Sequence, residues 1–142
     1  MLKDLTKKYF IDQNCNCAHA VFYAVADDFN IELTEQTKKV VAPFGGGMGA
    51  GCTCGALTGA VAAIGLVIDS KETYYKDIRV DLLKQFKERF QTFECVELTP
   101  KYKKDVFNTK KCYEIVEGTL EILDNLFDEY LENSDSAVCS SW

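Results

Sequence analysis

The cysteines are the side chains of this sequence best suited to chemistry. There are seven among 142 residues, and two of them, Cys52 and Cys54, follow a glycine-rich run that begins at Gly45. Clustered thiols in proteins form disulfides, exchange electrons or bind metals. The count is odd, so a complete intramolecular pairing would leave at least one thiol over.

Cys54 is expected to lie at the start of a helix. The glycines before it allow positive φ and close backbone approach. The small apolar residues Ala60 to Ile68 after it indicate a buried helix, with Thr53 as the N-cap. The first helical turn offers unpaired N–H groups and the positive end of the helix dipole, which stabilise an anion. Because cysteine reactivity follows the thiolate fraction, the sequence predicts that Cys54 is reactive.

Three more cysteines have notable positions. Cys17 lies on the core side of a predicted helix, Cys95 lies at a break between helices, and Cys112 lies on the core side of the last helix. Any one of them could be a small buried hydrophobic residue. Together with Cys54, and next to a glycine-rich turn, they favour a shared chemical role.

Two Cys-x-Cys pairs could add thiols to this site, namely Cys15 with Cys17 and Cys52 with Cys54. His19, the single histidine, follows Cys15 by one helical turn and could act as a base for a thiol or as a nitrogen ligand. Thiolates in this number also suit zinc or an iron–sulfur cluster, although the long spacings select no particular metal. The full set of candidate metal ligands is Cys15, Cys17, Cys52, Cys54, Cys95, Cys112 and His19.

The composition favours a cytoplasmic globular protein. Hydrophobic residues make up 47% of the chain, and the net charge of -6 comes without a basic run, so nucleic acid is a poor candidate partner. The N-terminus lacks the apolar core of a signal peptide. The longest apolar stretch, Cys54 to Ile68, is shorter than the roughly 20 residues of a membrane span. In the cytoplasm, redox or metal chemistry is favoured over static disulfides.

Helices are the elements expected to position the cysteines. Apolar residues at steps of three and four predict helices over about 2–10, 15–28, 34–42, 54–68, 70–93 and 109–132. Residues 94–100 are expected to form a loop or a helical break, with Pro100 as the breaking residue. The sequence therefore predicts an all-α single domain of five or six helices over 1–133, packed around the glycine-rich loop and the buried small-residue helix. A polar tail, 134–142, with an exposed Cys139, would follow.

One six-residue segment, Cys54-Gly55-Ala56-Leu57-Thr58-Gly59, resembles the Cys-Gly-Ala-x-x-Gly motif of the C-GCAxxG-C-C family of redox-active proteins. The resemblance extends to Asn16-Cys17-Ala18-His19-Ala20-Val21, Pro43-Phe44-Gly45-Gly46-Gly47, Phe93-Glu94-Cys95-Val96-Glu97-Leu98 and Lys111-Cys112. It covers nearly the whole chain. It implies a helical domain whose four family cysteines are Cys17, Cys54, Cys95 and Cys112, and it implies no substrate.

The first functional hypothesis is thiol–disulfide or electron-transfer chemistry, which would make the protein a possible thiol-disulfide oxidoreductase. Cys54 would attack, Cys17 would resolve the mixed disulfide, and Cys95 and Cys112 would form a second pair or a relay. The alternative is a binding module in which the same thiolates hold zinc or an iron–sulfur cluster. A third possibility is a helical scaffold with inert cysteines.

Cofactors and partners are less defined by the sequence. The loop of Gly45, Gly46 and Gly47 resembles a phosphate cradle in composition and is a candidate cofactor-binding segment, although no Lys-Ser or Lys-Thr follows it. No cofactor is certain. An unidentified redox partner is expected, and a homodimer is plausible from the small-residue helix and the aromatic stripe over 75–93.

Overall fold

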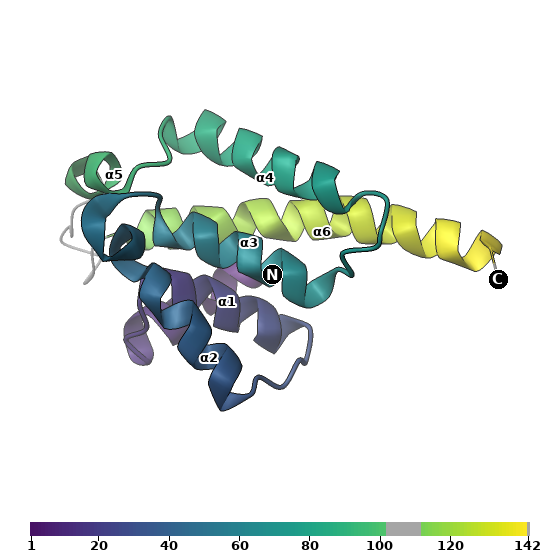
Figure 1. Cartoon of the computed structure of the whole chain (residues 1–142), viewed down its shortest axis with the longest axis horizontal. Coiled ribbons are helices and arrows are strands. Elements are labelled where there is room, and N and C mark those ends of the chain that lie inside the picture. Colours follow the sequence, from purple (N-terminus) through teal and green to yellow (C-terminus); the bar gives the residue numbers. More distant parts are fainter. Residues whose placement is uncertain (102–111, 142) are drawn as a thin grey trace.

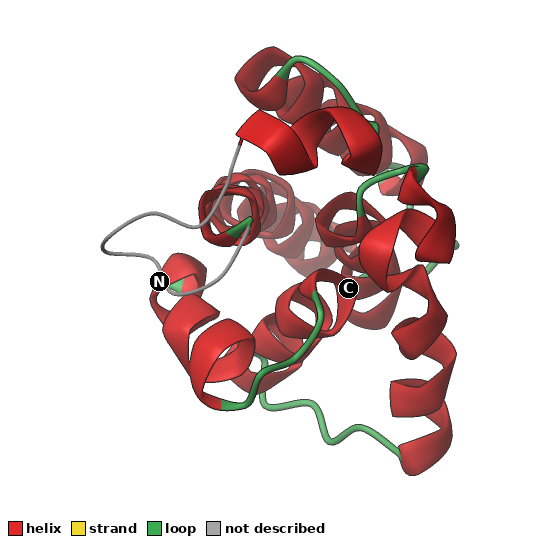
Figure 2. Ribbon diagram, turned by 90° about the vertical axis from the view of Figure 1, so that its left-hand side faces the viewer, coloured by secondary structure: helices red, strands yellow, loops and turns green. Residues whose placement is uncertain are grey.

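The computed structural model describes residues 1–101 and 112–141, the last nine by their backbone alone. This part of the chain is helical and has no strand (Figure 2). Its seven helices are the π-helix η2 (Lys7–Asp12) and the α-helices α1 (Cys17–Asp28), α2 (Glu35–Val41), α3 (Gly55–Val67), α4 (Tyr75–Phe90), α5 (Cys95–Lys101) and α6 (Tyr113–Ser141). Three shorter helical turns are η1 (Leu2–Leu5), η3 (Ala42–Phe44) and η4 (Gly47–Gly51).

The prediction of a helical fold without strands is confirmed, but the predicted count of five or six helices is wrong. The additional helix is α5, which forms where a loop or break was expected. Its first turn begins with the amides of Glu97 and Leu98, which both donate to the carbonyl of Glu94. Leu98 is fully buried and anchors α5 to the core. Pro100 lies inside α5, where it cannot donate a backbone hydrogen bond to Val96, yet the helix continues to Lys101.

Small residues place α3 in the centre of the core. Ala56, Ala60 and Ala63 are completely buried. Gly59 has no room for a side chain, because a Cβ there would lie 2.5 Å from the carbonyl oxygen of Ala18 in α1. The backbones of α1 and α3 therefore touch, which explains why this helix is rich in glycine and alanine.

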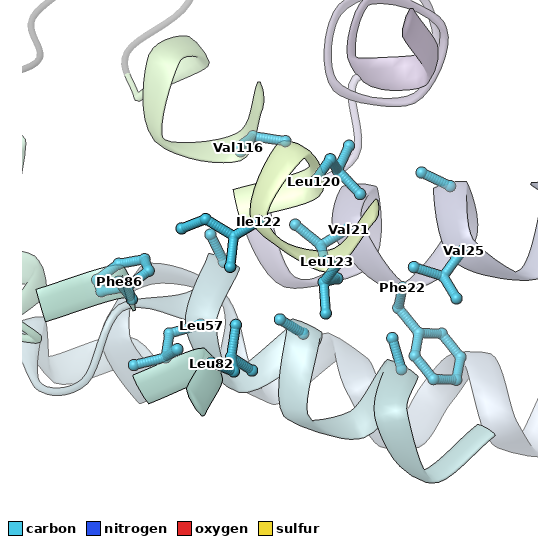
Figure 3. Close-up of a cluster of buried hydrophobic side chains, with 14 of the residues drawn as sticks. Val21, Phe22, Val25, Leu57, Leu82, Phe86, Val116, Leu120, Ile122 and Leu123 are labelled. Atoms are coloured by element: carbon cyan, nitrogen blue, oxygen red, sulfur yellow. The ribbon is translucent and has the colours of Figure 1, made fainter. Parts of the chain in front are cut away.

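Larger side chains from α4 and α6 complete the same core. Figure 3 shows residues of α1, α3, α4 and α6 meeting, among them Val21, Leu57, Phe86 and Leu123. All four are at most 1% exposed. The apolar stripes predicted for these helices are thus the faces that they bury.

The helix boundaries differ from the predicted ones by a few residues. The N-cap of α1 is Asn16 rather than Asn14, since the Asn16 Oδ1 accepts from the His19 amide at 2.8 Å. Thr34 caps α2 as predicted, accepting from the Thr37 amide at 3.1 Å. α4 begins at Tyr75 and not near residue 70.

The C-terminal helix is longer than predicted. Its backbone continues to Ser141, through most of the segment expected as a polar tail, and it extends beyond the other helices (Figure 1). The predicted start near residue 109 and the side chain of Cys139 lie outside the described residues. The division between a domain and a tail stays a prediction.

Four helices begin at one end of the molecule. In Figure 1 the starts of α1, α3, α5 and α6 lie at the left, whereas α4 runs in the opposite direction.

Across the ranges 1–101 and 112–141, no helix combines the length and apolar character that crossing a bilayer requires.

Candidate functional site

The glycine-rich segment forms a tight left-handed turn ahead of α3. Gly46, Gly47, Met48 and Gly49 all have positive φ, between 62° and 75°. Three of the four lack a Cβ, so this conformation costs little there. The Cys52 amide donates to the Gly47 carbonyl at 3.0 Å and closes the turn.

The residues after the turn pair with the segment that precedes α5. Thr53 and Glu94 form an isolated antiparallel bridge. The Cys54 amide donates to the Phe93 carbonyl at 2.7 Å, and the Cys95 amide donates to the Cys52 carbonyl at 2.6 Å. This contact was missed from the sequence, because a bridge of one residue pair is too short to leave an alternating pattern.

Cys54 is the N-cap of α3, one residue after the predicted N-cap Thr53, and its side chain makes no capping hydrogen bond. The side chain is only 5% exposed. Burial, followed by the neighbouring Cys17 thiol and, least, the Cys112 thiol, raises the pKa of the Cys54 thiol to about 12, against a smaller lowering by the backbone amides of Leu57 and Ala56. The raised pKa opposes the predicted activation of the Cys54 thiolate, since desolvation outweighs the helix start, and the catalytic role of Cys54 stays a prediction.

Cys17 and Cys112 lie near Cys54 at the starts of two other helices. Cys17 is the first residue of α1, is half-buried, and places its Sγ 2.6 Å from the position that a Cβ would take at Gly55. Cys112 precedes α6 and accepts the amides of Ile115 and Val116 on its carbonyl, both at 3.1 Å. The structure thus gathers three of the four family cysteines at the starts of α1, α3 and α6.

Cys95 occupies a neighbouring position, next to the glycine turn. Its Cβ lies 2.7 Å from the point where Gly47 would carry a side chain. Its Sγ lies 3.6 Å from the Thr99 hydroxyl. Cys52 is exposed, and its Sγ lies 4.0 Å from the carbonyl of Ala50. The pairing of Cys95 with Cys112 stays a prediction.

Cys15 and His19 contact a different set of residues. The His19 Nε2 donates to the carbonyl of Lys38 in α2 at 2.8 Å, and its ring stacks on Tyr23 with centroids 4.9 Å apart. Burial, followed by the nearby Cys15 thiol, raises the pKa of Tyr23. One nitrogen of His19 is therefore already bonded to a carbonyl on the α1–α2 side.

The proposed metal and cofactor residues have structural contacts of their own. Within the described ranges, no three Cys, His, Asp or Glu side chains are arranged to hold a metal ion. A Cβ at Gly45 would lie 2.5 Å from the side-chain nitrogen (Nδ2) of Asn16, and one at Gly47 would meet the backbone of Cys52. Packing thus explains these two glycines, and a cofactor role for the loop stays a prediction.

Comparison with known proteins assigns the family. The model of the family described as "Putative redox-active protein (C_GCAxxG_C_C)" matches residues 15–140, so the chain belongs to this family. An "Uncharacterized protein" of Archaeoglobus fulgidus is 31% identical over 135 residues, which cover 84% of this chain and 89% of that protein. No solved structure matches the chain. The resemblance inferred from the cysteine motifs is confirmed.

Proposed function

We propose that this protein exchanges electrons through a reversible disulfide between Cys17 and Cys54. One observation carries the proposal: the Cys17 sulfur lies 2.6 Å from the Cβ position of Gly55, the residue that follows Cys54. Membership of a family described as redox-active supports the same chemistry.

The two thiols differ in accessibility, and this difference suggests their roles. Cys17 is half-buried and can be reached from solvent, whereas Cys54 is almost completely buried. A thiol whose pKa is about 12 stays protonated at neutral pH and is a poor first nucleophile. We therefore assign the attack to Cys17 and the resolving step to Cys54, which reverses the order predicted from the sequence.

The reaction balances as an exchange of two electrons. The Cys17 thiolate attacks one sulfur of a substrate disulfide, and the first substrate thiolate leaves and takes up a proton. Cys54 then gives up its proton and attacks the Cys17 sulfur, which releases the second substrate thiol. The substrate gains two electrons, and an external dithiol must reduce the Cys17–Cys54 disulfide to complete the cycle.

Thiol counting in defined redox buffers tests the proposal. As the ratio of oxidised to reduced dithiothreitol rises, the reduced protein should lose both thiols of this pair in one two-electron transition. Cys17→Ser and Cys54→Ser should abolish that transition, whereas Cys15→Ser, the matched control on the same segment, should keep it. All of these proteins also carry Cys52→Ser and Cys95→Ser, so that those two thiols cannot contribute a transition of their own. A transition that survives both active variants in this background would reject the pair.

Metal analysis of anaerobically purified protein tests the alternative function. The alternative of a zinc or iron–sulfur site predicts bound metal, with acid-labile sulfide in the second case. Metal at about one ion or cluster per chain, lost in Cys17→Ser, would favour the binding module over the disulfide. The redox proposal predicts a folded, metal-free protein that retains its two-electron transition.

A further inference from the structure

We propose that Cys52 and Cys95 form a second redox-active dithiol, at the surface and separate from the Cys17–Cys54 pair. Cys52 lies outside the four family cysteines, so this couple is a feature of this chain rather than of the family motif. The inference does not depend on the proposed function, because it rests on a different part of the backbone. Its ligand class is a small disulfide that can reach the exposed Cys52.

The backbone register brings the two residues opposite each other. Thr53 and Glu94 are the bridge pair, and the Cys95 amide donates to the Cys52 carbonyl at 2.6 Å. Residues that flank an antiparallel bridge pair are cross-strand neighbours, with Cα atoms about 4.5–5.5 Å apart. That separation falls within the range of about 4.4–6.8 Å found across disulfides.

Gly47 holds both cysteines against the same point of the turn. A Cβ at Gly47 would lie 2.7 Å from the Cys95 Cβ and 2.7 Å from the Cys52 amide nitrogen. Its φ of +62° also disfavours other residue types. The absence of a side chain at Gly47 therefore allows the two cysteine segments to approach each other.

Neither sulfur is held strongly in its present position. The Cys52 Sγ makes only a 4.0 Å contact with the Ala50 carbonyl, and the Cys95 Sγ lies 3.6 Å from the Thr99 hydroxyl. Thiols are weak hydrogen-bond donors, so rotating either side chain costs little. Both side chains can therefore rotate toward each other, as disulfide formation would require.

Access to this pair is open from solvent. Cys52 is exposed, and the adjacent Met48 and Val96 are 48% and 65% exposed. A Cβ at Gly51, the residue before Cys52, would lie 3.3 Å from the Cβ of Val96, the residue after Cys95, so the turn and α5 are in contact at this surface. An external disulfide can therefore reach Cys52 without entering the core.

The oxidation balances with a small disulfide as the oxidant. The Cys52 thiolate attacks one sulfur of oxidised glutathione, and one glutathione thiol leaves with a proton. Cys95 then loses its proton and attacks the Cys52 sulfur, and the second glutathione thiol is released. Two electrons pass from the dithiol to the oxidant, and the new bond ties the glycine turn to the start of α5.

The test isolates this pair in the full-length Cys17→Ser/Cys54→Ser protein. After oxidation with glutathione disulfide and digestion with trypsin, the expected product joins residues 40–71, which contain Cys52, to residues 90–101, which contain Cys95. Adding Cys52→Ser should abolish the cross-linked peptide completely, whereas adding Cys15→Ser should leave it unchanged. Circular dichroism on each variant confirms that the helices have formed.

Two results would overturn the inference. One is the recovery of Cys52 and Cys95 only as separate glutathione adducts, and the other is a disulfide that joins Cys95 to another cysteine. The Cys17–Cys54 proposal is tested separately, in a Cys52→Ser/Cys95→Ser protein that keeps those two thiols. If one pair forms no disulfide in its own variant, the result for the other pair is unaffected.

Discussion

The sulfur of Cys17 lies where the side chain of Gly55 would be, 2.6 Å from the expected Cβ position. Gly55 is the first residue of α3 and follows Cys54 directly. The missing side chain therefore lets the start of α1 approach the start of α3. In the family motif, the glycine after the cysteine can be understood as the residue that makes room for a second thiol.

Gly55→Ala should disturb the Cys17–Cys54 couple. The added methyl group must displace the Cys17 sulfur, which we expect to destabilise the reduced protein by about 1–3 kcal/mol, the usual cost of overpacking. A difference of about 1.4 kcal/mol between the two redox states would shift the midpoint potential by about 30 mV. Chemical denaturation and redox titration measure these effects. An unchanged midpoint and stability would show that the two segments do not meet in this way.

Gly59→Ala should destabilise the fold without a direct effect on the thiols. Its methyl group would lie 2.5 Å from the Ala18 carbonyl oxygen, and a backbone atom cannot move without shifting α1. We expect a loss of about 1–3 kcal/mol in the free energy of unfolding. Gly65→Ala, in the same helix, is the matched control: its nearest neighbour is the Tyr75 hydroxyl at 3.8 Å. That variant should gain up to about 1 kcal/mol from helix propensity, and equal effects in both variants would contradict this packing.

Alkylation of the reduced protein should follow the burial of the cysteines. Iodoacetamide at about pH 8 is expected to modify the exposed Cys52 first and Cys54 last. The raised pKa of Cys54 alone slows its reaction on the order of fiftyfold, because the lower thiolate fraction outweighs the higher nucleophilicity of each thiolate. Mass spectrometry of timed samples gives the order. Early modification of Cys54 in the folded protein would restore the view that the helix start activates it.

Stability should fall at alkaline pH because of Cys54. The thiol titrates near 9.0 in its ordinary environment and near 12 in the folded protein, so between these values the unfolded chain binds fewer protons. The contribution of Cys54 to the free energy of unfolding is therefore complete below about pH 9 and is lost as pH rises toward 12. Over this range the free energy of unfolding falls by up to about 1.4 kcal/mol per pH unit. Cys54→Ala should show a shallower slope in denaturation curves. Equal slopes in the two proteins would mean that Cys54 is not buried as a thiol.

Local patterns were sufficient to predict most of the fold. The apolar spacing in α1, α4 and α6 gives their buried faces, and Thr34 marks the start of α2, since these signals lie within a few residues of one another. The start of α5 depends on a bridge between Thr53 and Glu94, which are far apart in the sequence. Such a contact leaves no local pattern, so a break was predicted there instead.

For the candidate site, too, local sequence patterns predicted one part and contacts between distant segments decide the rest. The glycine run and the cysteine after it correctly locate a helix start, and this start was the basis for expecting a reactive Cys54. Its burial comes from packing against α1 and α6, and the sequence near Cys54 does not report that packing. The register of Cys52 against Cys95 likewise depends on two distant segments, so no spacing rule could have predicted it.

Disulfide mapping of the full-length Cys15→Ser/Cys52→Ser protein tests the central claim most directly, because each relevant tryptic peptide then keeps one cysteine. After mild oxidation, we predict that residues 9–38, with Cys17, are joined to residues 40–71, with Cys54. Reduction with dithiothreitol should reverse the linkage. If Cys17 and Cys54 are instead recovered unlinked to each other, the proposal of a reversible disulfide between them is contradicted.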